Sequence, residues 1–268
     1  MTAKIGRTSA AMTDRAVVRK TDVVKGLREV GIREGDIIGV HSSLSRFGHV
    51  EGGAEAVVDA LLEAVGATGS VVVPSYSNNV EHVARTPEEK TLGMTWKSRI
   101  LPFDPKSHGC WTGKIPDTFW RRPEAVRGNH RTHSLAAIGP HAEELVKGWH
   151  VLRDLDGHIV LLGITLACCS SMHLAEEGIE LPRYITSKMT MPKELGERYP
   201  SDQWETGFGP YPDFVLMEGP CQEKGIMTLV RIGDAVVRRV RLRELIELYA
   251  KYLRRSPEIF YHGCVSQD

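Results

Sequence analysis

Residues 36–75 most strongly restrict the fold of this chain, because they read in succession as strand, loop, helix and strand. The apolar run at 37–40 ends in a polar stretch at 41–43, which predicts a buried strand with polar groups at its end. Apolar residues at helical spacing then predict a long helix over 54–65. The valine run at 71–73 predicts a second strand. Two strands joined by a helical crossover lie parallel. The unit therefore predicts an α/β fold with a largely parallel central sheet.

The rest of the chain fits a single domain over 1–268, with 1–20 as a flexible or extended N-terminal segment. Residues 77–115 show no sustained period, which favours a functional loop on the substrate side. Further along, β-branched content at 183–191 and 226–240 predicts strands, and hence a small β-containing subdomain over 183–240. The apolar spacing from Leu242 to Leu253 predicts a closing amphipathic helix.

Composition narrows the classes of function. With 268 residues and 41% hydrophobic content, the chain can bury a large core. Its 34 basic and 34 acidic residues balance, so neither nucleic acid nor an anionic membrane is an expected partner. No apolar stretch has the length of a membrane span or a signal peptide. Five cysteines without zinc-ligand spacing are typical of a reducing cytoplasm, where we expect the protein to reside.

The loop after the first strand is a candidate phosphate site. It contains His41, Ser42, Ser43 and Leu44, and the long helix follows it. Backbone amides and hydroxyls at such a corner can hold a phosphate or pyrophosphate group. The loop has no Gly-Lys-Ser/Thr sequence and lacks the spacing of a dinucleotide fingerprint, so an ordinary polar connection remains the alternative.

His173 is the strongest candidate for acid–base chemistry. It falls in the first turn of an expected helix after the strand at 159–163, with Glu176 and Glu177 on the same helix face. A helix N-terminus favours the neutral imidazole, whereas a carboxylate favours the imidazolium, so the two effects compete. The residues alone also allow a capping or core histidine. A metal half-site lacks a third ligand with convincing spacing.

Other charged residues leave their roles open. The cationic segment from Arg127 to His133 suits either an anion or a solvated surface loop. Glu81, Asp104, Glu205 and Asp213 suit either a cationic substrate or the surface.

Taken in order, several segments resemble the aminoglycoside 3-N-acetyltransferase family, also called the antibiotic N-acetyltransferases, over roughly residues 20 to 260. The matching segments are 40–44, 50–54, 68–69, 74–77, 102–105, 117–120, His130 with Ser134, and 156–163 leading to His173-Leu174-Ala175-Glu176. The resemblance implies a three-layer α/β/α sandwich with a smaller β-containing C-terminal part.

The resemblance also implies the reaction and its residues. The acetyl group of acetyl-CoA would pass to the 3-amino group of the 2-deoxystreptamine ring of an aminoglycoside, with His173 as general base and no metal. A carboxylate would assist His173, with Glu205 as first choice and Glu176 as second. His41, Ser42, Ser43 and Leu44 would hold coenzyme A, and Thr165 or nearby backbone amides would face the thioester carbonyl. The expected aminoglycoside contacts are Tyr76, Glu81, Asp104, Glu205 and Asp213.

Two departures from the family pattern leave the substrate open. Gly128 and Arg131 stand where many relatives have serine and proline. We hypothesise that Arg131 meets a coenzyme phosphate. Another amine as acceptor, a non-catalytic binding protein of the same fold and a homodimeric assembly remain alternatives.

Overall fold

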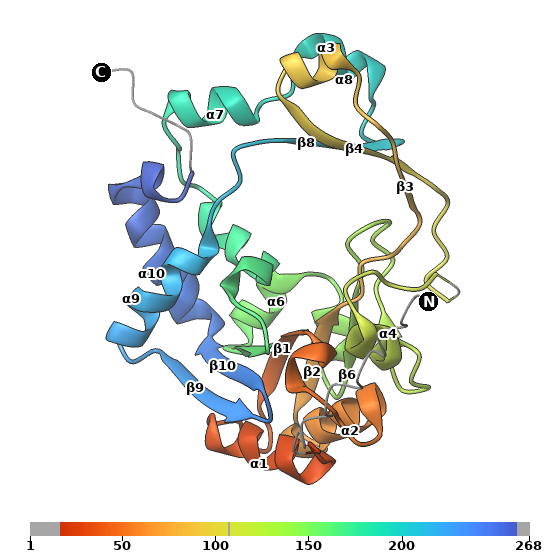
Figure 1. Ribbon diagram of the computed structural model, residues 1–268, viewed down its shortest axis with the longest axis vertical. Coiled ribbons are helices and arrows are strands. Elements are labelled where there is room, and N and C mark those ends of the chain that lie inside the picture. The colour runs from red at the N-terminus through yellow and green to blue at the C-terminus, as the bar shows by residue number, and fades with distance from the viewer. Residues whose placement is uncertain (1–16, 107, 262–268) are drawn as a thin grey trace, which may run out of the picture.

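The computed structural model describes residues 17–106 and 108–261. The expected N-terminal segment thus lies outside the described residues up to position 16. A seven-stranded sheet with strand order β5-β6-β2-β1-β7-β10-β9 forms the body of the molecule. Figure 1 labels β1, β2, β6, β9 and β10 of this sheet. Its strands are β1 (Ile37–Ser42), β2 (Ser70–Pro74), β5 (Val126–Arg127), β6 (Leu135–Ile138), β7 (His158–Leu162), β9 (Met227–Ile232) and β10 (Ala235–Arg241).

The centre of this sheet is parallel and its flanks are antiparallel. Strand β1 pairs parallel with both β2 and β7, as the crossover unit predicts. Strands β6 and β10 pair antiparallel with β2 and β7, and each flank ends in another antiparallel pair. On one flank, β9 and β10 are joined by a tight turn at Gly233, which permits only antiparallel pairing. The expected α/β fold is confirmed, and the parallel arrangement is confined to the three central strands.

Helices cover both faces of the sheet, so the expected three-layer sandwich is confirmed. Side chains alternate along the strands: Val71 and Val73 enter one core, and Val72 enters the other. The first core receives α1 (Lys20–Glu29), α2 (Gly53–Val65) and α4 (Lys114–Trp120). The second receives α5 (Ala142–Leu145), α6 (Trp149–Asp154), α9 (Glu218–Glu223) and α10 (Leu242–Arg255).

A second, three-stranded sheet lies at the far end of the molecule from α1 and α2 (Figure 1). It contains β3 (Val80–His82), β4 (Met94–Ile100) and β8 (Trp204–Phe208), with α3 (Pro87–Thr91), α7 (Arg183–Met189) and α8 (Lys193–Arg198) beside it. This arrangement differs from the expected subdomain over 183–240. Two of the three strands come from the segment that we expected to be irregular, and 226–240 supplies main-sheet strands instead.

The strand expected at 183–191 is wrong, because α7 occupies that segment. The β-branched residues suggested a strand, but β propensity is a weak guide where no alternating face is buried. Within α7 only Ile185 is buried. Pro182 is the N-cap residue of this helix, with a φ of −54° and an extended ψ of 146°.

A buried ion pair joins the elements of the small sheet. The Lys97 ammonium on β4 lies 2.8 Å from the Glu89 carboxylate of α3 and 2.9 Å from the Tyr199 hydroxyl after α8. The Tyr199 hydroxyl also donates to Glu89. Burial alone would raise the pKa of Glu89, but hydrogen bonds from Lys97, Tyr199 and the Thr86 backbone lower it to about 2. The pair is therefore charged and closely packed.

Candidate active site

The carboxyl ends of the three central parallel strands meet at one edge of the sheet, where ligands bind in folds of this class. Strand β1 ends at Ser42, directly beside the last residue of β7, Leu162. Two 3₁₀ helices follow β7, η2 (Leu166–Cys168) and η3 (Ser170–Glu176), and η3 carries His173. A cleft of about 430 Å³ opens here. Its lining includes His41, Ser42, Tyr76, Trp111, His173 and Phe214.

His173 has a carboxylate partner in its own turn. Its Nδ1 lies 3.2 Å from Oε2 of Glu176, and its ring meets the Phe214 ring edge-on at 4.9 Å between centroids. The His173 side chain is 54% exposed. An Nδ1–H donating to Glu176 leaves Nε2 as the acceptor for a substrate proton.

Glu205, our first choice as the partner of His173, is bound elsewhere. It lies on β8 of the small sheet, where it accepts a hydrogen bond from the Thr132 hydroxyl and lies 3.4 Å from His133 Nδ1. Among the described residues, no hydrogen bond or ion pair joins it to His173. The expected Glu205–His173 contact is therefore corrected to Glu176–His173, because η3 brings Glu176 within reach through a three-residue spacing.

Glu205 still borders the site indirectly. Burial raises its pKa, but hydrogen bonds from His133 and Thr132 outweigh burial and hold the pKa below its usual value. The His133 ring in turn meets the Tyr76 ring at 4.8 Å, and Tyr76 lines the cleft. His133 therefore lies between the Glu205 carboxylate and Tyr76 in the cleft lining.

The floor of the cleft contains two buried polar groups from β1. His41 is stacked on Trp149 at 5.1 Å, and burial lowers its pKa to about 4, which keeps the ring neutral. His41 Nε2 and the Ser42 hydroxyl have no hydrogen-bond partner among residues 17–106 and 108–261. Buried polar atoms normally find partners. On the opposite wall, the Tyr76 hydroxyl lies 2.6 Å from the Ser170 hydroxyl.

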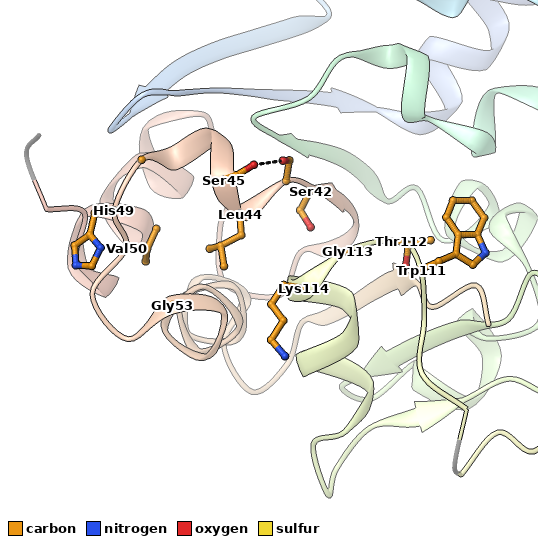
Figure 2. A pocket seen from close by; sticks show the side chains of 12 residues that line it. Ser42, Leu44, Ser45, His49, Val50, Gly53, Trp111, Thr112, Gly113 and Lys114 are labelled. Atoms are coloured by element: carbon orange, nitrogen blue, oxygen red, sulfur yellow. Dashed lines mark hydrogen bonds between the residues drawn. The ribbon is translucent and has the colours of Figure 1, made fainter. Parts of the chain in front are cut away.

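A second pocket of about 630 Å³ adjoins this cleft and shares Ser42, Trp111 and Thr112 with it. One wall is the segment from Ser42 to the first residue of α2, Gly53, and the other wall is the segment 111–114 (Figure 2). Lys114, at the start of α4, places a largely exposed ammonium group at its edge. Ser42, Ser43 and Leu44 therefore line this pocket.

Sequence reasoning missed the second wall. Residues 111–114 fall inside the segment 77–115 that has no period, and nothing in their spacing singles them out. The structure supplies the signal that the sequence lacks: the Trp111 side chain is 62% exposed, and exposed aromatic side chains often mark ligand-binding surfaces.

Arg131 lies away from both pockets. Its guanidinium donates to the backbone carbonyls of Asp202 and Ser201, which precede β8. The hypothesis that Arg131 meets a coenzyme phosphate is therefore not supported by its position. It anchors the small sheet to the segment that carries His133.

The remaining expected contacts are spread over the molecule. Glu81 faces Arg99 within the small sheet at 4.0 Å, and Asp104 accepts a hydrogen bond from the Lys106 amide. Asp213 caps the 3₁₀ helix η4 (Phe214–Met217) by accepting from the Val215 amide at 3.1 Å. Thr165 precedes η2, and its neighbours Ile164 and Ala167 line the cleft. Of the expected substrate contacts, Tyr76 is the one that the structure places in the cleft lining.

Within the described ranges, no group of three or more histidine, cysteine or acidic side chains could hold a metal ion. In the same part of the chain, no helix has the length and apolar content needed to cross a bilayer.

Comparisons with known proteins show the family and the fold of this chain. Residues 40–254 match the family described as aminoglycoside 3-N-acetyltransferase. The aminoglycoside N(3)-acetyltransferase III from Salmonella sp is 34% identical over 267 residues, covering 90% of this chain and 88% of the relative.

Two solved structures share the fold. One is aminoglycoside acetyltransferase AAC(3)-IVa as a mutant in complex with apramycin, with a TM-score of 0.71 and 23% identity, covering 96% of this chain and 100% of that one. The other is AAC-IIIb in a binary complex with CoASH, with a TM-score of 0.67 and 20% identity, covering 92% and 99%.

Proposed function

The chain belongs to the aminoglycoside 3-N-acetyltransferase family, and we propose that it transfers the acetyl group of acetyl-CoA to the 3-amino group of the 2-deoxystreptamine ring of aminoglycosides. A product acetylated there would give resistance to the antibiotic. The observation that carries this proposal is the pair of adjoining pockets, one containing His173 and both sharing Ser42. Such a pair suits two substrates that must meet at one point.

His173 acts as the general base. Glu176 holds the imidazole through Nδ1, so Nε2 accepts the proton of the attacking amine. The amine nitrogen forms a bond to the thioester carbon and the carbon–sulfur bond breaks. The proton on His173 then passes to the departing thiolate, which restores the neutral base. This sequence uses no covalent acyl-enzyme.

The wall shared by the two pockets stabilises the negative charge that develops on the thioester carbonyl oxygen. The thioester carbonyl gains negative charge as the amine attacks, and a donor fixed near that oxygen lowers the barrier. The Ser42 hydroxyl is the best placed candidate, because it is buried, lies in the lining of both pockets and has no partner among the described residues. The neutral His41 ring beside it avoids placing a cation next to the incoming polycation.

The pocket between Ser43 and Lys114 would hold coenzyme A. We expect Lys114→Ala to raise the KM for acetyl-CoA about three- to tenfold, because an exposed ammonium contributes about 1 kcal/mol to phosphate binding, and kcat should change little. Steady-state kinetics at two salt concentrations would measure the effect. Lys90→Ala, an exposed lysine on α3, is the matched control. An unchanged KM would place the coenzyme phosphates elsewhere.

A thiol-release assay with acetyl-CoA tests the substrate class. We expect coenzyme A release with aminoglycosides that carry a free 3-amino group and none with matched compounds in which that group is absent or blocked. Release with both sets, or with neither, would favour the alternative in which the same residues acetylate another amine.

Two broader expectations belong to the same proposal. The described cysteines, Cys110, Cys168, Cys169 and Cys221, are free thiols, which suits the reducing cytoplasm expected from the sequence. Homodimer formation is a separate expectation that light scattering on the purified protein would test.

A further inference from the structure

Behind His173 lie three buried polar atoms that the proposed mechanism does not use. They are Oε1 of Glu176 and the hydroxyls of Tyr249 and Tyr261. Both tyrosines are completely buried. None of the three atoms has a partner with good hydrogen-bond geometry in the described part of the chain. Because an unpaired buried polar group is costly, three such atoms in one place usually serve one another.

The aromatic packing places this cluster next to the catalytic histidine. The Phe214 ring touches His173 on one side at 4.9 Å and Tyr249 on the other at 5.5 Å. The Tyr249 ring packs on Phe260 at 4.9 Å, and Phe260 precedes Tyr261. Phe214, Tyr249, Phe260 and Tyr261 all belong to the same apolar core. Helix α10 supplies Tyr249, and the segment after η5 (Pro257–Ile259) supplies Tyr261.

Electrostatics indicates which way the protons point. Burial raises the pKa of both tyrosines, and the negative charge of Glu176 raises it further. Tyr261 is near enough to Glu176, and Tyr249 to Tyr261, for hydrogen bonding to contribute to these shifts. Both hydroxyls therefore stay protonated, and a protonated hydroxyl beside a carboxylate oxygen acts as a donor.

We propose that Tyr261 is a positioning residue that donates a hydrogen bond to Oε1 of Glu176, while Tyr249 donates to the Tyr261 oxygen. The carboxylate is then held at one oxygen by Tyr261, and its other oxygen, Oε2, orients His173. This inference rests on the proposed role of His173. Tyr261 lies beyond residue 254, where the match to the family model ends.

The consequence is a selective loss of turnover. Without the Tyr261 donor, Glu176 can rotate and the imidazole loses its fixed orientation, whereas neither pocket lining changes. We expect Tyr261→Phe to lower kcat about tenfold, the usual scale for one hydrogen bond to a charged group, with both KM values within about twofold of wild type. A residue with only a structural role would change thermal stability and leave the kcat of the folded protein intact.

A double-mutant cycle with Glu176→Gln separates the two roles. If Tyr261 acts through the Glu176 charge, Tyr261→Phe lowers kcat less than about twofold in the Glu176→Gln background. Tyr252→Phe, on the same helix as Tyr249 and also in contact with Phe260, is the matched control and should match wild type. If Tyr261→Phe fails to fold, Tyr249→Phe is used in the same cycle with the same expected coupling.

The outcomes distinguish this inference from the proposed function. A tenfold loss that disappears in the Glu176→Gln background supports it. Wild-type kcat for folded Tyr261→Phe, or an equal loss in both backgrounds, overturns it while leaving His173 as the base. Near-normal acetylation by a folded His173→Ala protein would instead remove the proposed mechanism itself.

Discussion

We expect the His173→Ala variant to remain folded and to lose at least about a hundredfold in kcat, the usual scale for a positioned acid or base. The side chain is half exposed and lies against the Glu176 carboxylate and the Phe214 ring, so its removal costs little packing. Thiol release under saturating acetyl-CoA and aminoglycoside measures the loss, and circular dichroism checks the fold.

The control for this variant is His150→Ala, an exposed histidine on α6 that lines neither pocket. It should retain wild-type kinetics. Acetylation by His173→Ala within about fivefold of wild type would contradict a general-base role, and the amine would then have to lose its proton to another group.

The second large effect concerns stability rather than turnover. Lys97→Met removes the cation from the buried pair of the small sheet and leaves the Glu89 carboxylate without its charge partner. Breaking a buried pair from one side costs about 3–5 kcal/mol, and we expect that loss in the free energy of unfolding. Urea denaturation followed by tryptophan fluorescence measures it. The matched control is Lys90→Ala on α3, expected within about 0.5 kcal/mol of wild type.

The Lys97–Glu89 pair also predicts that the protein loses stability as the pH falls. The pKa of Glu89 is about 2 in the folded protein, against 4.5 for the free group. Its contribution to stability is therefore complete above pH 4.5 and is lost as the pH falls towards 2. The double variant Lys97→Met with Glu89→Leu should lose most of this acid dependence. If the single Lys97→Met variant were as stable as wild type, the ion pair would have no role in holding the small sheet.

The sequence predicts the main sheet well because its signals are local. The apolar run 37–40, the helix at 54–65 and the strand at 71–73 each follow from periodicity, and the parallel direction of the two strands follows from the crossover connection. The loop at Ser42 could be placed at a ligand-binding edge for the same reason. The helical turn that brings Glu176 to His173 also depends only on a three-residue spacing.

The small sheet depends on contacts between distant segments, which periodicity does not reveal. Strand β4 pairs with β8 across about a hundred residues, and a three-residue strand such as β3 is too short to show a period. Glu205 was misplaced for this reason, because its carboxylate faces Thr132 and His133 only after β8 has paired with β4. The second wall of the proposed coenzyme pocket, from Trp111 to Lys114, likewise exists only in the folded chain.

The position of the acetyl group on the product is the most direct test of the account. Wild-type protein, acetyl-CoA and an aminoglycoside with several free amines would be incubated together, and the product analysed by two-dimensional NMR. The account predicts one N-acetyl group, on the 3-amino nitrogen of the 2-deoxystreptamine ring, and no such product with the His173→Ala protein. Acetylation at another nitrogen, or coenzyme A release without an acetylated product, would contradict it.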